Sequence, residues 1–335
     1  MQGFRAPRWL PGGHAQTIWP ALFSRRCPSS PFGQPLAWQR ERWTTPDGDF
    51  IDVDLLPPRP AEAAAPTASA PMLVLFHGLE GSSASHEAQA FGHWARQAGW
   101  AFAVPHFRGC SGELNLAPRA YHSGDHEELG WILQRLRQRS NQPLRVVGVS
   151  LGGNALLRWA EEVGSSASAT VAAVAAVSAP VDLAASGQAI GQGLNRQIYT
   201  RMFLRSMKPK ALAKLAQHPG LFSREKLLAA RTLYEFDDVF TAPLHGFAGT
   251  RDYWARASAK PQLHRIRVPT LVLNAHNDPF VPGNSLPTPG SVGPWVSLWQ
   301  PSHGGHVGFP AGRFPGHVLD LPEGVMAWMT QHQPG

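Results

Sequence analysis

Residues 148–152 read Gly-Val-Ser-Leu-Gly, a pentapeptide that places Ser150 between glycines. A strand-like run at 145–149 leads into the serine, and a helical pattern at 154–162 follows it. This is the arrangement of a nucleophile elbow, in which a serine occupies a strained turn between a strand and a helix and glycines permit close packing. The free amides at the start of the following helix favour negative charge near the serine. Ser150 is therefore the candidate nucleophile.

A serine hydroxyl needs a base to become reactive, and the base needs an acid that orients it. On folds with a nucleophile elbow, the acid and then the histidine follow the serine along the chain, each in a loop after a strand. The apolar run at 270–274 leads to Asp278, which is the candidate acid. Three other aspartates are weaker alternatives because none ends a late strand beside a histidine loop: Asp182, Asp237 and Asp238.

Two histidines follow the next strand-like run, at 296–299. Both His303 and His306 could reach the serine. His306 has two glycines before it and a small-residue turn after it, which suits a close approach. We predict that His306 is the base and that His303 is a loop residue.

Acyl transfer to a serine builds negative charge on the carbonyl oxygen, so backbone amides must lie close to that oxygen. The Leu151 amide directly follows the nucleophile. The second amide is expected from the loop after the first central strand, where Leu79 follows a His-Gly pair. Residues 107–112 are expected to form the pocket wall, and Cys110 has no evident base that would make it a reactive thiolate.

The elements that must position these residues alternate along the chain. Continuous apolar runs, typical of buried parallel strands, are separated by helical patterns, which predicts an α/β fold with a doubly wound, mostly parallel sheet. Two antiparallel strands are predicted before them, at 40–44 and 50–56, and in the second Asp52 and Asp54 are expected on a half-exposed face. The first forty residues are expected to wrap irregularly over the body, and residues 61–71 to form a connection without structure of their own.

Between residues 178 and 270 the alternation stops and mainly helical patterns follow. We predict a catalytic body at 1–181 and 256–335, with a helical lid inserted at 182–255.

Composition excludes several classes of protein. The chain has 335 residues, 43% of them hydrophobic and 16% charged, which excludes a globally disordered chain. The longest nearly apolar stretch, at 171–181, is half of the ~20 residues that a membrane span requires. No signal peptide is recognisable, and two cysteines, Cys27 and Cys110, provide neither a disulfide framework nor zinc-ligand spacing. We expect a cytoplasmic protein.

The formal net charge of +7 is concentrated in one segment, because residues 194–232 contain nine Lys or Arg and a single acidic residue, Glu225. Without any nucleic-acid-binding signature, this charge indicates a solvated helical face or a local anionic partner. Helical spacing places Leu194, Ile198, Tyr199, Met202 and Phe203 on one apolar stripe, with Arg196, Arg201 and Arg205 between them. The stripe either docks onto the catalytic body or lies in a membrane interface.

Ten blocks between positions 9 and 309 together resemble the YheT-like branch of the α/β-hydrolase superfamily, the group that includes mammalian abhydrolase-domain lipases and phospholipases. The blocks are WL at 9–10, HAQT at 14–17, HGLEGS at 77–82, FRGCSGE at 107–113, YHSGD at 121–125, VSLGGN at 149–154, EFDD at 235–238, TAPLHGF at 241–247, NDPF at 277–280 and GHVGF at 305–309. The resemblance implies a charge-relay triad of Ser150, Asp278 and His306. It also implies carboxylesterase or acylglycerol-lipase activity on short or medium acyl chains. Where the family often has Asn before Phe-Arg-Gly this chain has His106, so its substrate preference is expected to differ near the pocket.

The sequence thus predicts a serine hydrolase that cleaves carboxylic esters through an acyl-serine intermediate, without a metal or organic cofactor. Two alternatives stay open. One is transfer of the acyl group to an alcohol, and the other is a non-catalytic scaffold that binds lipid or protein. The expected partners are a small ester substrate and, transiently, an anionic membrane surface, but no nucleic acid.

Overall fold

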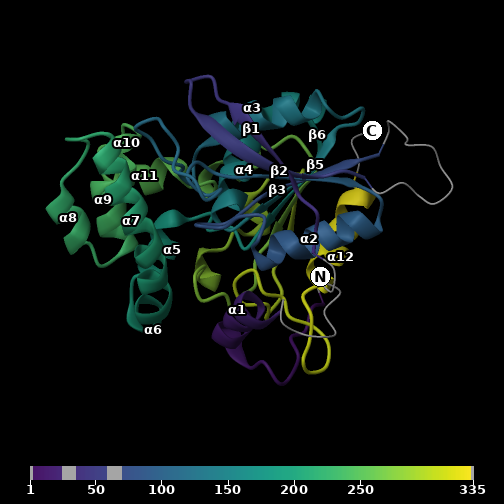
Figure 1. The fold of residues 1–335 in the computed structure, drawn as a ribbon. Coiled ribbons are helices and arrows are strands. Elements are labelled where there is room, and N and C mark those ends of the chain that lie inside the picture. Colours follow the sequence, from purple (N-terminus) through teal and green to yellow (C-terminus); the bar gives the residue numbers. More distant parts are fainter. Residues whose placement is uncertain (1–2, 25–34, 59–69, 333–335) are drawn as a thin grey trace.

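A mixed eight-stranded β-sheet forms the centre of the computed structural model, which describes residues 3–24, 35–58 and 70–332 (Figure 1). The strand order is β1-β2-β4-β3-β5-β6-β7-β8. The first two strands pair antiparallel, β2 is also antiparallel to β4, and β3 to β8 run parallel. The strands are β1 (Gln39–Thr44), β2 (Phe50–Leu56), β3 (Met72–Phe76), β4 (Ala101–Pro105), β5 (Leu144–Val149), β6 (Val171–Val177), β7 (Thr270–Leu273) and β8 (Val296–Trp299).

Successive residues of each parallel strand point to opposite faces of the sheet, and both faces are covered. In β5, Val146 packs under α3 (His126–Arg137) and α4 (Leu151–Val163), whereas its neighbour Val147 packs under α2 (His86–Gln97) and α12 (Asp320–Gln331). Figure 1 shows these helices on the two sides of the sheet. Burial on both faces explains why the strands read as continuous apolar runs, and the predicted α/β hydrolase architecture is confirmed.

The two aspartates of β2 are buried, so the prediction of a half-exposed face is wrong. Asp52 and Asp54 are each 2% exposed, because arginines of β1 and residues of the loops after β3 and β4 contact them. Arg42 donates two hydrogen bonds to Asp52, and Arg40 donates two to Asp54 at 2.7 and 2.9 Å. Burial raises the pKa of Asp54, but hydrogen bonds from Arg40, His106 and Ser83 outweigh it and hold that pKa below its ordinary range.

The N-terminal segment contains a regular helix, α1 (Gly12–Phe23), where an irregular wrap was predicted. Its sequence, rich in Gly, Trp and Pro, has little helix propensity, so tertiary packing stabilises the helix. Gln16, Thr17, Trp19 and Pro20 are buried against the body. Cys27 and residues 61–69 of the predicted connection lie outside the described residues.

The segment between β6 and β7 is helical, as predicted, and forms the green and teal group at the left of Figure 1. It has an apolar core of its own that includes Leu204, Leu227 and Phe236. The limits predicted at residues 182 and 255 stay a prediction. The helices are α5 (Leu183–Ile190), α6 (Gly193–Asn195), the π-helix η3 (Arg196–Thr200), α7 (Arg201–Gln217), α8 (Arg224–Ala229), α9 (Leu233–Val239), α10 (Thr241–Leu244) and α11 (Thr250–Ala257).

Short 3₁₀ turns complete the described elements: η2 (Gly164–Ala169), η4 (Lys260–Arg265), η5 (Gly283–Ser285) and η6 (Pro289–Ser291). Within the described ranges, no helix combines the length and the apolar character needed to cross a bilayer.

Candidate active site

Ser150 lies in the turn between β5 and α4, with the unusual backbone angles φ 52° and ψ −118°. Such a conformation of a non-glycine residue costs about 1–3 kcal/mol and persists only where the surroundings enforce it. The Ser150 amide donates to the Val177 carbonyl at 2.8 Å. Close packing requires both glycines. A Cβ on Gly148 would lie 2.5 Å from the Gly152 carbonyl oxygen, and a Cβ on Gly152 would lie 2.5 Å from the His77 carbonyl oxygen. The local sequence therefore forms the predicted elbow.

The structure brings Asp278 and His306 together with Ser150 in a continuous line of hydrogen bonds. His306 Nε2 lies 2.9 Å from Ser150 Oγ, and His306 Nδ1 lies 2.8 Å from Asp278 Oδ2. The other Asp278 oxygen accepts from the Phe280 and Val281 amides at 2.7 and 3.2 Å. With Asp278 accepting at Nδ1–H, the imidazole presents Nε2 to the serine as an acceptor.

Helix α1 holds the loops of both the acid and the histidine, a role that sequence reasoning missed. Gln16 Oε1 accepts from Asn277 Nδ2 and from the Gly304 amide, both at 2.9 Å. Thr17 Oγ1 accepts from the His306 amide at 2.9 Å. The sequence marks the His-Ala-Gln-Thr block only as part of the resemblance, and the contacts of Gln16 and Thr17 with these loops span more than 260 residues.

The turn after β3 faces the elbow. A Cβ on Gly78 would lie 3.2 Å from Ser150 Cβ, so the backbone of this turn approaches the nucleophile closely. Leu79 and Leu151 both line the cavity next to Ser150. Within the described part of the chain, neither Leu amide donates to a protein acceptor.

His77 secures the start of this turn. Its Nδ1 lies 2.8 Å from the Gly78 carbonyl, and its Nε2 accepts from the Phe107 amide at 3.1 Å. Burial lowers the pKa of His77 to about 3, so the ring is neutral at pH 7, with Nδ1–H as the donor.

The alternative residues lie elsewhere. His303 is exposed and does not line the cavity. Asp182 caps α5 by accepting from the Ala185 amide, and Asp238 accepts from the Thr250 amide. Asp237 does line the cavity, where it accepts from Trp254 Nε1 and Thr241 Oγ1, and burial raises its pKa to about 6.

Two expectations about the loop after β4 are refined by the structure. Arg108 and Gly109 line the cavity, as expected for a pocket wall. His106 does not line it, and its Nε2 lies 2.9 Å from Asp54 Oδ2; its expected effect on substrate preference stays a prediction. Cys110 is buried, and burial raises the pKa of its thiol to about 12.

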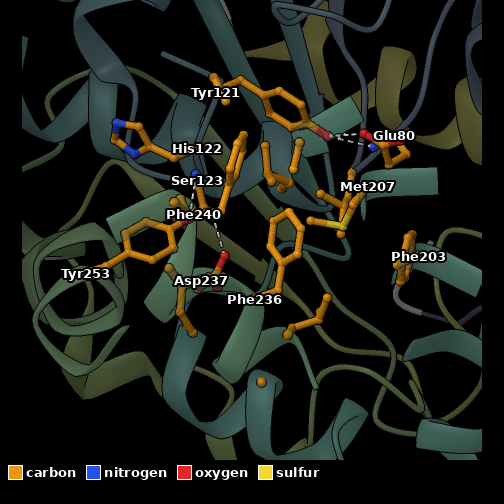
Figure 2. Close-up of a pocket in the computed structure, with 18 of the residues that line it drawn as sticks. Glu80, Tyr121, His122, Ser123, Phe203, Met207, Phe236, Asp237, Phe240 and Tyr253 are labelled. Atoms are coloured by element: carbon orange, nitrogen blue, oxygen red, sulfur yellow. Dashed lines mark hydrogen bonds between the residues drawn. The ribbon is translucent and has the colours of Figure 1, made fainter. Parts of the chain in front are cut away.

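A largely apolar cavity of about 160 Å³ opens beside Ser150 and His306. The inserted helices form much of its wall, and Figure 2 shows Phe203, Met207, Phe236 and Phe240 along it. Polar side chains also line it, among them Asp237, from whose carboxylate Figure 2 draws a hydrogen bond. Among the described residues, no group of three or more His, Cys, Asp or Glu side chains could hold a metal ion.

Comparisons with known proteins agree with this architecture. The family model for the alpha/beta hydrolase fold matches residues 71–312. The chain is 39% identical over 322 residues to YheT of Escherichia coli (strain K12), a candidate esterase, covering 95% of this chain and 90% of the relative. It is 26% identical over 287 residues to the phospholipase ABHD3 of Homo sapiens (84% and 69% covered), and 27% identical over 338 residues to the monoacylglycerol lipase ABHD2 of Mus musculus (96% and 76%).

Solved structures show the same fold at low sequence identity. An esterase of Pyrococcus furiosus superposes with a TM-score of 0.53 at 16% identity, covering 89% of this chain and 94% of that chain. The resemblance inferred from the sequence blocks is confirmed. The chain belongs to the α/β hydrolase fold family and is an esterase- and lipase-like member of it.

Proposed function

We propose that the protein hydrolyses carboxylic esters through an acyl-serine intermediate, with Ser150 as the nucleophile, His306 as the base and Asp278 as the orienting acid. The observation that carries the proposal is the line of hydrogen bonds from Asp278 through His306 to Ser150, which ends at the apolar cavity. A serine nucleophile, a histidine base and an acid at these distances are the components that acyl transfer requires.

The reaction then follows from the geometry. Ser150 Oγ attacks the ester carbonyl carbon while His306 Nε2 takes the hydroxyl proton, and Asp278 stabilises the resulting imidazolium. The carbonyl oxygen becomes negatively charged and accepts hydrogen bonds from the Leu79 and Leu151 amides. When the tetrahedral intermediate collapses, the C–O bond to the alcohol breaks and His306 returns the proton to that alcohol. Water repeats the sequence on the acyl-serine and releases the carboxylic acid.

The cavity supports a substrate with a short acyl chain. A cavity of roughly 150 Å³ holds a benzene ring, so the observed 160 Å³ has room for about six carbon atoms. Two curated relatives are named as a phospholipase and a monoacylglycerol lipase, which supports a lipid ester as the substrate. A short or medium acyl chain of such an ester would enter the cavity. Transfer to an alcohol acceptor uses the same groups and stays an alternative. The cytoplasmic location stays a prediction.

We also propose that the inserted helices bring the enzyme transiently to anionic membrane surfaces. The apolar stripe predicted from the sequence is divided in the structure: Tyr199 packs inward against Phe280, whereas Leu194 and Met202 are more than half exposed. Ile198 lies with them on the exposed side.

Basic side chains flank this exposed stripe, and Arg201 and Arg205 are exposed beside it. Of the nine basic residues at 194–232, Lys210 alone forms an ion pair within the described part of the chain. An exposed apolar stripe flanked by arginines is the pattern of a helix that lies in a membrane interface. Each basic residue near such a surface contributes about 1 kcal/mol.

The esterase proposal is tested by a fluorophosphonate probe, which labels an activated serine, and by p-nitrophenyl esters of graded acyl length. The unchanged protein should be labelled at Ser150 and should hydrolyse butyrate faster than palmitate. Ser150→Ala should lose labelling and roughly 10⁴- to 10⁶-fold in kcat/KM, the scale of a missing triad nucleophile. Ser302→Ala, which changes an exposed serine, is the matched control. Full activity in Ser150→Ala would exclude the proposed mechanism.

A further inference from the structure

The tight turn that carries the proposed oxyanion amide contains a conformational anomaly. The Gly81 amide donates to the Gly78 carbonyl at 3.0 Å, which closes a four-residue turn with Leu79 and Glu80 at its centre. Glu80 has a φ of 59°, in the left-handed region. Turns of this kind normally place glycine at that position, because a side chain there strains the backbone. The glutamate therefore needs a compensating interaction that a glycine could not make.

The Glu80 side chain makes two such interactions. The Tyr121 hydroxyl donates to Glu80 Oε1 at 3.0 Å, and it also accepts from the Glu80 backbone amide at 3.0 Å, a bond that a glycine would keep (Figure 2). The second carboxylate oxygen, Oε2, lies 2.9 Å from Lys210 Nζ. Tyr121 is itself stacked on Phe107, with ring centroids 5.2 Å apart and an interplanar angle of 14°. Tyr121 thus fixes the turn to the body, whereas Lys210 reaches it from another element.

Lys210 belongs to α7, one of the inserted helices. One face of this helix lines the cavity, with Phe203, Met207, Lys210 and Lys214 at helical spacing. Lys214 anchors the C-terminal end of the helix, because its buried ammonium donates to the Asn115 and Ala117 carbonyls at 2.5 and 2.9 Å.

The ion pair of Lys210 is a weaker contact than this anchor. The Lys210 side chain is 38% exposed, and an ion pair that water can reach is weak and screened by salt. Pro209, immediately before it, lacks the amide that would bond to the preceding turn, which allows the helix to bend at this point. Lys210 lies on the same side of this bend as Lys214, so the pair with Glu80 opens by movement of the exposed Lys210 side chain or of the whole helix.

We propose that Glu80 is a positioning residue that couples the inserted helix α7 to the oxyanion turn. When α7 lies over the cavity, Lys210 holds Glu80 in its left-handed conformation, and the neighbouring Leu79 amide points to the reacting carbonyl. When α7 moves away, the ion pair opens, and the turn keeps its Tyr121 hydrogen bonds but loses the restraint from Lys210. The enzyme is thus fully active only with its lid closed. The inference rests on the proposed esterase function and adds that the position of α7 controls the conformation of the oxyanion turn.

The first test compares three lysine variants on p-nitrophenyl butyrate. Lys210→Met should lower kcat about tenfold with KM within about twofold, because a misplaced donor weakens binding of the transition state more than that of the substrate. Lys210→Arg, which keeps the charge, should restore most of the rate. Lys208→Met removes the same charge from the same helix, but this side chain contacts the Leu228 carbonyl and does not line the cavity, so its kcat should be unchanged. High salt should lower kcat of the unchanged protein and leave Lys210→Met unaffected.

A second test does not depend on turnover. Amide hydrogen exchange at residues 78–83 should be faster in Lys210→Met and in Glu80→Gln than in the unchanged protein, and Lys208→Met should show no change. Glu80→Gly should keep or raise the melting temperature, since glycine relieves the strain, while lowering kcat. A purely structural role for Glu80 would lower both together.

The coupling is overturned if Lys210→Met keeps both the kcat and the exchange rates of the unchanged protein, or if Lys208→Met lowers kcat as much. Failure of the esterase function has a different signature, namely no turnover and no fluorophosphonate labelling of the unchanged protein. The exchange experiment still decides the coupling in that case.

Discussion

The imidazole of His306 is held by its partners on both ring nitrogens and by the Phe280 ring, whose centroid lies 4.1 Å away at an interplanar angle of 32°. His306→Ala should therefore lose roughly 10³-fold or more in kcat/KM, the scale of a missing triad member. The exposed His303 makes no contact with the cavity, so His303→Ala should stay within a fewfold of the unchanged protein. Steady-state kinetics on one ester decides the ranking, and the reverse order would identify His303 as the base.

The thiol of Cys110 should be chemically silent in the folded protein. Burial raises its pKa to about 12, so only about 10⁻⁴ of it is ionised at pH 8, against roughly a quarter of a free thiol. We expect no alkylation of Cys110 by iodoacetamide at pH 8, rapid alkylation after unfolding in urea, and normal esterase activity in Cys110→Ala. Mass spectrometry of the peptide reports the modification. Rapid labelling of the native thiol would show that it is accessible and reactive.

At the scale of elements, α1 acts as a clamp on the loops that carry Asp278 and His306. Gln16→Ala removes the acceptor of two donors, the buried Gly304 amide and the partly buried Asn277 Nδ2, and a buried donor left unsatisfied costs about 1–3 kcal/mol. The free energy of unfolding should fall by about 2–4 kcal/mol, and kcat by about tenfold as the loops loosen. Urea unfolding and ester kinetics measure both.

The matched control is Gln134→Ala, which changes an exposed glutamine of α3 and should leave stability and rate unchanged. If Gln16→Ala behaved like this control, the clamp would have no energetic weight.

The elements differ in how far the sequence predicts them. The parallel strands could be predicted because burial on both faces makes them continuous apolar runs, and Ser150, Asp278 and His306 could be found because each follows such a run in a fixed order. Helix α1 could not, because its residues favour a helix only when packed against the body. The buried Asp52 and Asp54 were misjudged for a related reason: their arginine partners lie on another strand, and the alternating pattern alone looks like exposure.

For the whole molecule, the exposed stripe on the inserted helices should determine attachment to membranes. At low salt we expect the protein to co-sediment with vesicles in proportion to their anionic lipid content. At high salt it should be released, because the Debye length is about 8 Å at physiological ionic strength and becomes shorter as salt is added. The triple substitution of Arg196, Arg201 and Arg205 by Gln should abolish binding without lowering hydrolysis of a soluble ester.

The matched control replaces three exposed arginines of the body, Arg265, Arg267 and Arg313, by Gln and should bind as the unchanged protein does. Equal binding by both triple variants, or no binding at low salt, would leave the inserted helices a role in the cavity alone.

The clamp formed by α1 also sets the order in which the molecule can be completed during synthesis. Helix α1 leaves the ribosome before the loops that it contacts, and Gln16 is separated from Gly304 by 288 residues. At ~5–20 residues per second, its partners are made roughly 15–60 s later. For that time Gln16 Oε1 lacks its two donors on the late loops, whereas Trp19 can already pack against Trp9. Helix α1 is therefore synthesised long before it can dock, and the site is completed only after the loops of Asp278 and His306 have emerged.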